Sequence, residues 1–277
     1  MAAIALFLVI IIALCAVRLH QRRETRAEIA ETESTQIWYS EEQAESAESE
    51  TKDAADQTEE TTAGEKQTAG RGQGTNRWES AEGMNLLFSV LIHPSWIPVG
   101  RQFLLSEAGA LAIKEVLDGY TEGITLKWPN DIYWNDRKLS GTLIETAVSS
   151  QGLKKCVYGI GLNVNQTAFS DDLPNPVSLK QIVGHDVDRE QLLQELIVSF
   201  KKYYELTREG AYGDISELYF MNLYHRDGYY RFRDKEGEFE GRIFGVEDDG
   251  RLLLHDRQGC IREYSFKEVE FMIPAAQ

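Results

Sequence analysis

A long stretch without large apolar side chains decides which parts of this chain can fold. Between Ser40 and Arg77 there is no Val, Ile, Leu, Met, Phe, Trp, Tyr or Cys. Such a stretch cannot offset the entropy cost of ordering its backbone by burying apolar surface. Composition therefore predicts disorder for the acidic tract at residues 28–66 and a core built from the residues after it.

The same tract carries most of the negative charge. Of the formal net charge of −16, residues 28–66 contribute −11, because they hold 13 carboxylates and two lysines. Residues 67–277 are only mildly acidic, with 23 bases against 31 acids. Such a surface does not favour binding to nucleic acid phosphates, so no nucleic acid partner is expected.

The cysteines and the amino terminus bear on the compartment. The three cysteines, at positions 15, 156 and 260, have no paired spacing that suits a zinc site or a disulfide framework, so a reducing cytoplasm and no metal site are expected. Residues 2–17 are sixteen consecutive apolar residues with arginines on their carboxyl side. This run spans about 24 Å as a helix, less than the roughly 30 Å of a hydrocarbon core. One interpretation is a membrane anchor at residues 1–27 that leaves the rest in the cytoplasm; the other is a start that is not native.

From residue 84 onward, strand and helix patterns alternate. The run MNLLFSVLI at 84–92 is typical of a strand covered on both faces. Apolar residues at helical spacing predict a helix at 100–117. Short apolar segments predict further strands at 124–128, 132–134, 139–147 and 155–162, and helices at 191–204 and 214–224. This mixture predicts an α/β (α+β) fold in which helices pack on a mixed β-sheet.

The pattern changes after residue 226. About five short strands alternate with the turn sequences DKEG, EDDG and DRQG, each of which ends in glycine. About fifty residues of this kind predict a small β-barrel. The expected folded units are therefore residues 67–225 and 226–277.

The most informative motif is KWPNDIYWNDRKLSGTLIE at 127–145. Pro129 cannot donate to a sheet, so it ends the strand and places Asn130 and Asp131 on a turn that faces a cleft. If the segments on either side of residues 135–137 form a hairpin, Asp131 and Lys138 can contact one ligand. The alternative is a surface turn with ordinary solvated charges.

Two further motifs contain groups that could bind anions or amides. In QTAGRGQGTNRW at 67–78, three glycines surround Arg71, and glycine amides with a guanidinium suit a phosphate or carboxylate; a flexible linker end is the alternative. In GIGLNVN at 159–165, Asn163 and Asn165 project to the same side of a strand end. They could contact a ligand; the alternative is that these strand-end amides are solvated or cap a helix.

As a set, these motifs resemble the biotin protein ligase family. KWPND, RKLSG and GIGLNVN, preceded by QTAGRG and a tryptophan, occur in the family's order and at its spacings, and the resemblance covers residues 67–274. A fainter match lies at residues 31–36. The resemblance implies a mixed α/β catalytic domain followed by an SH3-like barrel. Because no amino-terminal helix-turn-helix is visible, it points to the short monofunctional form without a DNA-binding domain.

The resemblance also implies a reaction and its participants. Biotin and ATP, accompanied by Mg²⁺, would form biotinyl-AMP, and a lysine of a biotin carboxyl carrier domain would then accept the biotin. Lys138 would bind the reacting carboxylate, Lys127 the phosphates and Arg71 the adenylate, while Asp131 would orient the acceptor lysine; these four are the implied catalytic residues. The implied biotin contacts are Ser34, Thr35, Gln67, Gly70, Arg71, Gly72 and Lys138. The implied ATP contacts are Trp78, Lys127, Asn130, Asn163 and Asn165.

The chain departs from the family pattern in two places. Gln73 stands where the family often has a second arginine, and residues 41–66 are polar where the family has a helix and an apolar strand. Two alternatives to a biotin ligase therefore stay open. One is a degenerate, non-catalytic binding protein of the same fold, and the other is a lipoate ligase-like enzyme.

Overall fold

The computed structural model describes residues 38–39, 60–64, 70–71, 77–78, 80–149 and 152–273, which belong to one compact unit. Side chains are described for Trp78 and for the last two ranges. Ser34, Thr35, Gln67, Gly72 and the apolar segment at 2–17 lie outside the described residues. Within these ranges, no helix is long and apolar enough to cross a membrane.

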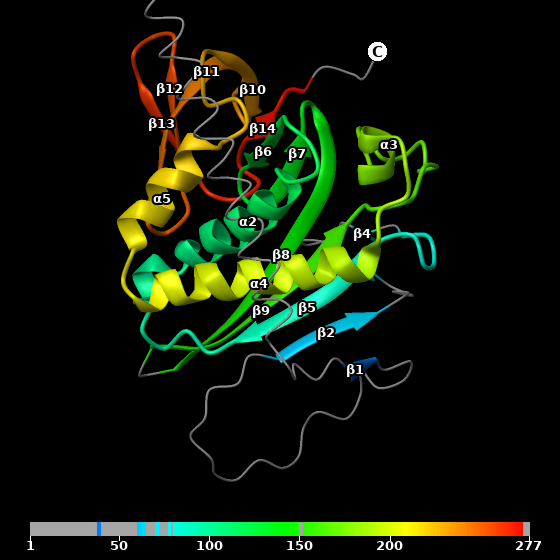
Figure 1. Cartoon of the computed structure of the whole chain (residues 1–277). Helices are drawn as coiled ribbons and strands as arrows, with labels where there is room; N and C mark the ends of the chain where they lie inside the picture. Colours follow the sequence, from blue (N-terminus) through cyan, green and yellow to red (C-terminus); the bar gives the residue numbers. More distant parts are fainter. Residues whose placement is uncertain are drawn as a thin grey trace, which may run out of the picture. The chain divides into compact units, whose positions relative to one another are not determined.

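The larger of two main sheets has seven strands in the order β1-β2-β5-β9-β8-β7-β6 (Figure 1). Its neighbours pair antiparallel, apart from the parallel pair β1–β2. The strands are β1 Trp38–Tyr39, β2 Glu60–Gly64, β5 Leu86–Ile92, β6 Ile124–Lys127, β7 Asp131–Trp134, β8 Arg137–Ser149 and β9 Gly152–Leu162. A separate short hairpin consists of β3 Gly70–Arg71 and β4 Arg77–Trp78.

Strand β2 differs from the composition-based expectation, since it lies inside the tract for which disorder was predicted. Its residues, ETTAG, are not strongly apolar, yet they pair in register with the buried strand β5, from Glu60 opposite Leu91 to Gly64 opposite Leu87. Backbone hydrogen bonds to a preformed strand require no large side chains. The polar segment Glu60–Gly64 therefore adds a strand to the sheet beside β5.

Helices cover one face of this sheet (Figure 1). They are η1 Val99–Arg101, α2 Phe103–Leu117, α3 Leu179–Val183, α4 Arg189–Arg208 and α5 Tyr212–Met221. Helix α4 begins at Asp188, whose carboxylate accepts from the backbone N–H groups of Glu190 and Gln191 at 3.0 and 3.1 Å. The prediction of helices packed on a mixed sheet is confirmed.

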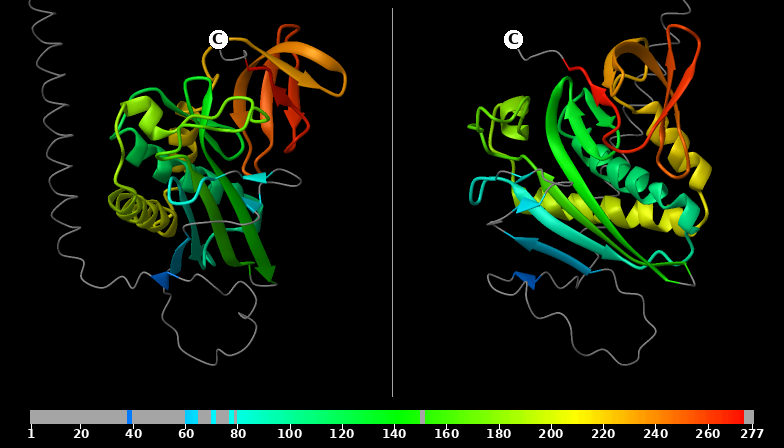
Figure 2. Two further views of the ribbon diagram at one scale, coloured as in Figure 1. Left: turned by 90° about the vertical axis from the view of Figure 1, so that its right-hand side faces the viewer. Right: turned by 180° about the vertical axis from the view of Figure 1, so that it is seen from behind.

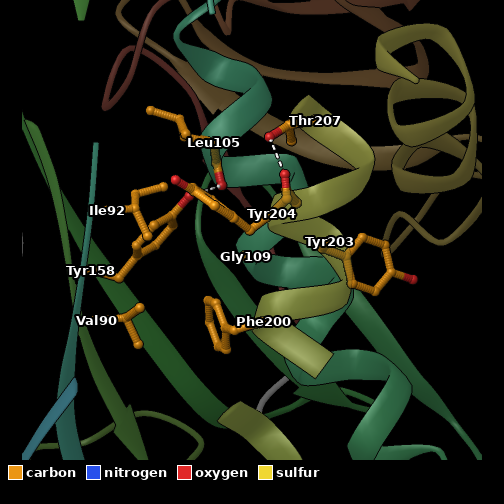
Figure 3. Close-up of a pocket in the computed structure, with 10 residues that line it drawn as sticks. Val90, Ile92, Leu105, Gly109, Tyr158, Phe200, Tyr203, Tyr204 and Thr207 are labelled. Carbon is orange, nitrogen blue, oxygen red and sulfur yellow. Dashed lines mark hydrogen bonds between the residues drawn. The ribbon is translucent and has the colours of Figure 1, made fainter. Parts of the chain in front are cut away.

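The core lies between this sheet and the two long helices α2 and α4. Figure 3 shows a small void within it, lined by residues such as Val90, Phe200 and Tyr158. Its volume is about 20 Å³, which is room for roughly one water molecule. The Tyr158 hydroxyl donates to the Leu105 carbonyl at 3.0 Å. The ring of Tyr158 comes so close to Gly109 that a Cβ there would lie 2.7 Å from it. This void is a packing gap, not a substrate site.

The second sheet has five strands in the order β13-β12-β11-β10-β14, as the sequence predicted after residue 226. They are β10 Tyr230–Asp234, β11 Gly237–Val246, β12 Leu252–Asp256, β13 Ile261–Tyr264 and β14 Glu270–Phe271. Figure 2 shows these strands curling into a small twisted sheet. The Trp128 indole donates to the Gly250 carbonyl at 2.9 Å, and Phe266 packs on Trp128 with ring centroids 5.4 Å apart. The second sheet therefore packs directly beside the KWPND turn.

Candidate active site

Two consecutive hairpins bring the charged residues of the KWPND motif together. In the β6–β7 hairpin Lys127 lies opposite Asp131, and in the β7–β8 hairpin Asp131 lies opposite Gly141. The register shifts between Ile132 and Tyr133, and such a bulge re-aims side chains. As a result Lys138 Nζ lies 2.7 Å from Asp131 Oδ1. The prediction that Asp131 and Lys138 can contact one ligand agrees with this geometry.

Glycines of the sheet leave open space beside the cluster of Lys127, Asp131 and Lys138. A Cβ at Gly141 would lie 3.2 Å from Lys138 Nζ and 3.3 Å from Asp131 Oδ1, so a larger residue would crowd both charges. Gly141 pairs with Gly161 on β9, and Gly159 is two residues further along that strand. The three glycines leave a strip of the sheet without side chains, where a ligand could approach the backbone.

Trp78 lies over this strip. A Cβ at Gly161 would come within 2.4 Å of the Trp78 ring, so the ring lies directly on the glycine. Lys138 Nζ is 5.9 Å from the centre of the same ring. The Trp78 indole N–H is buried and has no hydrogen-bond acceptor in the described part of the chain. Because β4 pairs with β3, the backbone of Gly70 and Arg71 is adjacent to Trp78; the Arg71 side chain is outside the described residues.

Lys127 has an unusual environment for a cation. Its Nζ lies 5.4 Å from the ring centre of Tyr133 and 4.9 Å from that of Phe271, which belongs to β14. Burial lowers the pKa of Lys127; Asp131 opposes this shift and Lys138 adds to it. No described residue accepts a hydrogen bond from its ammonium group. Lys127 therefore retains the capacity to bind an anion.

The three asparagines assigned to ATP are engaged with backbone. Asn163 Nδ2 donates to the Val177 carbonyl at 3.0 Å. Asn165 exchanges two hydrogen bonds of 2.9 Å with the backbone of Val187. Asn130 Nδ2 donates to the Thr142 carbonyl, and Thr142 N–H donates back to the Asn130 carbonyl. In this structure these three side chains hold the backbone around the cluster, and neither Asn163 nor Asn165 caps a described helix.

Sequence reasoning did not name Gly141, Gly159, Gly161, Tyr133 or Phe271 as residues of the site. Gly141 lies inside the RKLSG motif, and its closeness to two charged groups could have been inferred from the hairpin. Tyr133 alternates with Ile132 and reads as an ordinary core residue. Phe271 had no usable signal, because only the packing of the second sheet brings it to Lys127.

The cluster as a whole suits an anionic ligand. Lys138 pairs with Asp131, Lys127 makes no ion pair with a described residue, and the glycine strip leaves room for a ligand beside the sheet. Preorganised cations of this kind stabilise charge that develops on phosphate or carboxylate oxygens. No group of three or more His, Cys, Asp or Glu side chains that could hold a metal ion occurs among the described residues.

A comparison with known protein families finds a match for residues 36–165. The sequence profile of the Biotin/lipoate A/B protein ligase family matches residues 36–165, which include the whole cluster. This match agrees with the resemblance noted in the sequence.

Two named proteins are similar to most of this chain. The chain is 33% identical over 208 residues to the bifunctional ligase/repressor BirA of Bacillus spizizenii, which covers 73% of this chain and 63% of that protein. It is 27% identical over 201 residues to a biotin–[acetyl-CoA-carboxylase] ligase of Paracoccus denitrificans, covering 70% of this chain and 83% of the relative. The chain therefore spans just under two thirds of the BirA sequence.

Solved structures agree with the fold assignment. The biotin protein ligase of Aquifex aeolicus, in complex with biotin and ATP, superposes with a TM-score of 0.65 and 26% identity. The superposition covers 77% of this chain and 89% of that structure. The mixed sheet and the smaller second sheet therefore match the fold of that structure.

Proposed function

We propose that this chain is a biotin protein ligase. In the first step the biotin carboxylate oxygen attacks the α-phosphorus of ATP, giving biotinyl-AMP and pyrophosphate. In the second step the amine of an acceptor lysine attacks the carbonyl carbon of this anhydride, AMP leaves, and the amine loses a proton. The observation that carries the proposal is the cluster of Lys127, Asp131 and Lys138 on a glycine floor inside the family domain.

Lys138 and Lys127 bind different parts of the two substrates. Lys138 is about one third exposed, and its ammonium has donors left after the bond to Asp131, so it can bind the reacting carboxylate and then the adenylate. Lys127 is held between two aromatic rings and faces the phosphates of ATP. Because burial lowers the pKa of Lys127, an incoming phosphate would stabilise its charged form.

Asp131 links the two steps. In the free protein its carboxylate is paired with Lys138. When Lys138 binds the adenylate phosphate, that pairing weakens and Asp131 becomes available to a cation. The cation of the second step is the acceptor lysine, which Asp131 orients and deprotonates.

The remaining assignments follow the resemblance. Ser34, Thr35 and Gln67 contact biotin, and Gly70, Arg71 and Gly72 close over the adenylate. Trp78 contacts ATP, while Asn130, Asn163 and Asn165 hold the backbone that shapes the ATP side. Mg²⁺ arrives with the triphosphate as part of the substrate, a mode in which the metal needs one or two protein carboxylates at most.

The partner and the location belong to the same proposal. The acceptor is the biotin carboxyl carrier domain of a biotin-dependent carboxylase. The ligase domain is residues 67–225, and 226–277 form the SH3-like domain whose Phe271 completes the Lys127 environment. We place the enzyme in the cytoplasm, with residues 1–27 as the candidate anchor.

Biotin-dependent exchange of labelled pyrophosphate into ATP tests the first step in the purified full chain. The proposal predicts exchange with biotin and ATP, and little with lipoate at the same concentration. Exchange with lipoate alone would favour a lipoate ligase. Binding of biotin and ATP without exchange would favour a binding protein of the same fold.

A further inference from the structure

Helix α2 carries a carboxylate that the proposed reaction does not use. Glu107 is 4% exposed, and its Oε2 accepts a hydrogen bond of 2.6 Å from the Ser216 hydroxyl of α5. This is its only hydrogen bond to a described residue. A buried carboxylate with a single neutral donor is left with acceptor capacity that costs free energy unless something satisfies it.

Glu107 opens into a cleft between α2, α5 and the second sheet. The cleft has a volume of about 230 Å³. Besides Glu107, its lining includes Ser216, Glu217 and Phe220 of α5 and Phe244 of β11. It shares no residue with the Lys127–Asp131–Lys138 cluster, so it is a separate site.

The charges around the cleft are predominantly negative. Glu217 is exposed at its edge and has no side-chain partner among the described residues. The nearby Arg101 guanidinium is already paired with Asp248 at 2.8 Å. No unpaired described cation therefore lines the cleft to balance Glu107.

The aromatic walls favour a cation over a neutral ligand. Phe220 and Phe244 both line the cleft, and Phe244 is about half exposed. Aromatic faces attract ammonium groups, and their rings also cover an aliphatic stem. An anion would be repelled by Glu107 and Glu217, and an apolar molecule would leave the Glu107 carboxylate unpaired.

We propose that this cleft binds a primary alkylammonium group, the group that ends a lysine side chain, with Glu107 as its counter-ion and Phe220 and Phe244 packing on the aliphatic stem. The site goes beyond the proposed ligase reaction and does not depend on it. Two sources share this chemistry: a lysine side chain presented by another protein and a free alkylamine.

The protonation of Glu107 provides a specific readout. Burial, with a smaller contribution from nearby Asp248, raises the pKa of Glu107 to about 7, although Ser216 and Arg101 act to lower it. Tyr219 of α5 also faces Glu107, and burial holds its own pKa well above the usual range, so it stays neutral. Since a bound ammonium favours the charged carboxylate, binding should release more protons at pH 7 than at pH 9.

Calorimetric titration of the full chain with n-butylammonium, without biotin or ATP, tests the proposal. The chloride concentration is held constant, and two buffers of different ionisation enthalpy report the proton count. We expect a dissociation constant of about a millimolar, as suits a ligand of so few atoms. n-Butanol, which has the same stem without the charge, should bind at least about tenfold more weakly.

Variants locate the binding. Glu107→Gln keeps the size of the side chain and should weaken n-butylammonium at least about tenfold and abolish the proton release. Glu209→Gln, an exposed carboxylate that does not line the cleft, should change neither. Phe244→Ala should weaken the amine without changing the proton count. If Glu107→Gln fails to fold, the comparison of amine with alcohol in the unmodified chain still shows whether binding requires the positive charge of the ligand.

A third titrant separates the two sources. A capped Gly-Lys-Gly peptide that binds more tightly than n-butylammonium indicates a lysine of a partner protein, and weaker binding of the peptide indicates a free amine. Equal binding of amine and alcohol, or undiminished amine binding by Glu107→Gln, would overturn the proposal. A chain that binds the amine but exchanges no pyrophosphate would keep this site and refute only the ligase.

Discussion

Two clusters of charged residues in this chain are built from similar side chains but differ in how completely those side chains are paired. In the second sheet, Arg262 bonds Asp256 at 2.9 Å and Asp234 at 3.2 Å. Asp234 also accepts from the Tyr264 hydroxyl at 2.7 Å. Asp256 further accepts from the backbone N–H of Cys260 at 2.9 Å. Each charge there meets partners within the protein.

In the first sheet, by contrast, the charged side chains of Lys127, Asp131 and Lys138 are only partly paired. Lys138 is paired with Asp131, whereas Lys127 makes only ring contacts among the described residues. Charge alone therefore does not distinguish a structural network from a binding site. Unused hydrogen-bonding capacity does, because a buried cation without partners is stabilised when a ligand supplies them.

The largest effect is expected for Lys138→Ala. Removing a cation that contacts the reacting groups should lower biotin-dependent pyrophosphate release by about 10²–10³-fold. The fold should persist, since Lys138 is partly exposed and not part of the core. Lys235→Ala, an exposed lysine of the second sheet's turn, is the matched control. Release at the wild-type rate, at saturating biotin and ATP, would remove Lys138 from the site.

Asp131→Asn should separate the two steps. The amide can still orient a lysine but cannot attract or deprotonate it, so transfer to the carrier should slow by roughly 10- to 100-fold. Adenylate formation should change less. Single-turnover assays, with preformed biotinyl-AMP for the second step, measure each rate, and Asp171→Asn serves as an exposed control. Equal losses in both steps would contradict the role given to Asp131.

Gly161→Ala tests the floor of the site. Its Cβ would meet the Trp78 ring at 2.4 Å, so the ring must move, and we expect the KM for ATP to rise about tenfold. Gly213→Ala in α5 is the control, because a Cβ there would have no neighbour within 4 Å and Gly213 is not part of the glycine strip. If both variants behave alike in ATP titrations, Trp78 does not define the ATP side.

The smallest effect on activity is expected in the fully paired cluster. Asp256→Asn leaves Arg262 short of one charged partner, so the thermal midpoint should fall. Pyrophosphate release per folded molecule should stay unchanged. Glu236→Gln, whose carboxylate lies 4.0 Å from Arg262 and is largely exposed, should change neither quantity. A loss of activity in folded Asp256→Asn would mean that the second network is also functional.

The sequence predicted the features that depend on short-range geometry. Asp131 and Lys138 could be placed together because one hairpin connects them, and the five strands of the second sheet could be inferred from regularly spaced turns. The strand at Glu60–Gly64 could not be predicted, since its pairing comes from β5 and not from its own polar side chains.

Long-range packing accounts for the rest. Phe271 reaches Lys127 across 144 positions of sequence, and only the docking of the second sheet creates that contact. A lone glutamate such as Glu107 in an amphipathic helix is ordinarily a solvent-facing residue. It is buried because α5 and the second sheet cover that side of α2. The residue pattern of one helix does not reveal which distant elements will pack over it and bury a given side chain.

The most direct test of the central claim is the intact mass of a biotin carboxyl carrier domain after incubation with the purified full chain, biotin and ATP. The account predicts that the carrier gains the mass of one biotinyl group, on one lysine, only when both substrates are present. It also predicts that Lys138→Ala, at equal concentration, labels far less carrier in the same time. An unchanged carrier mass with the folded wild-type chain, or equal labelling by Lys138→Ala, would contradict it.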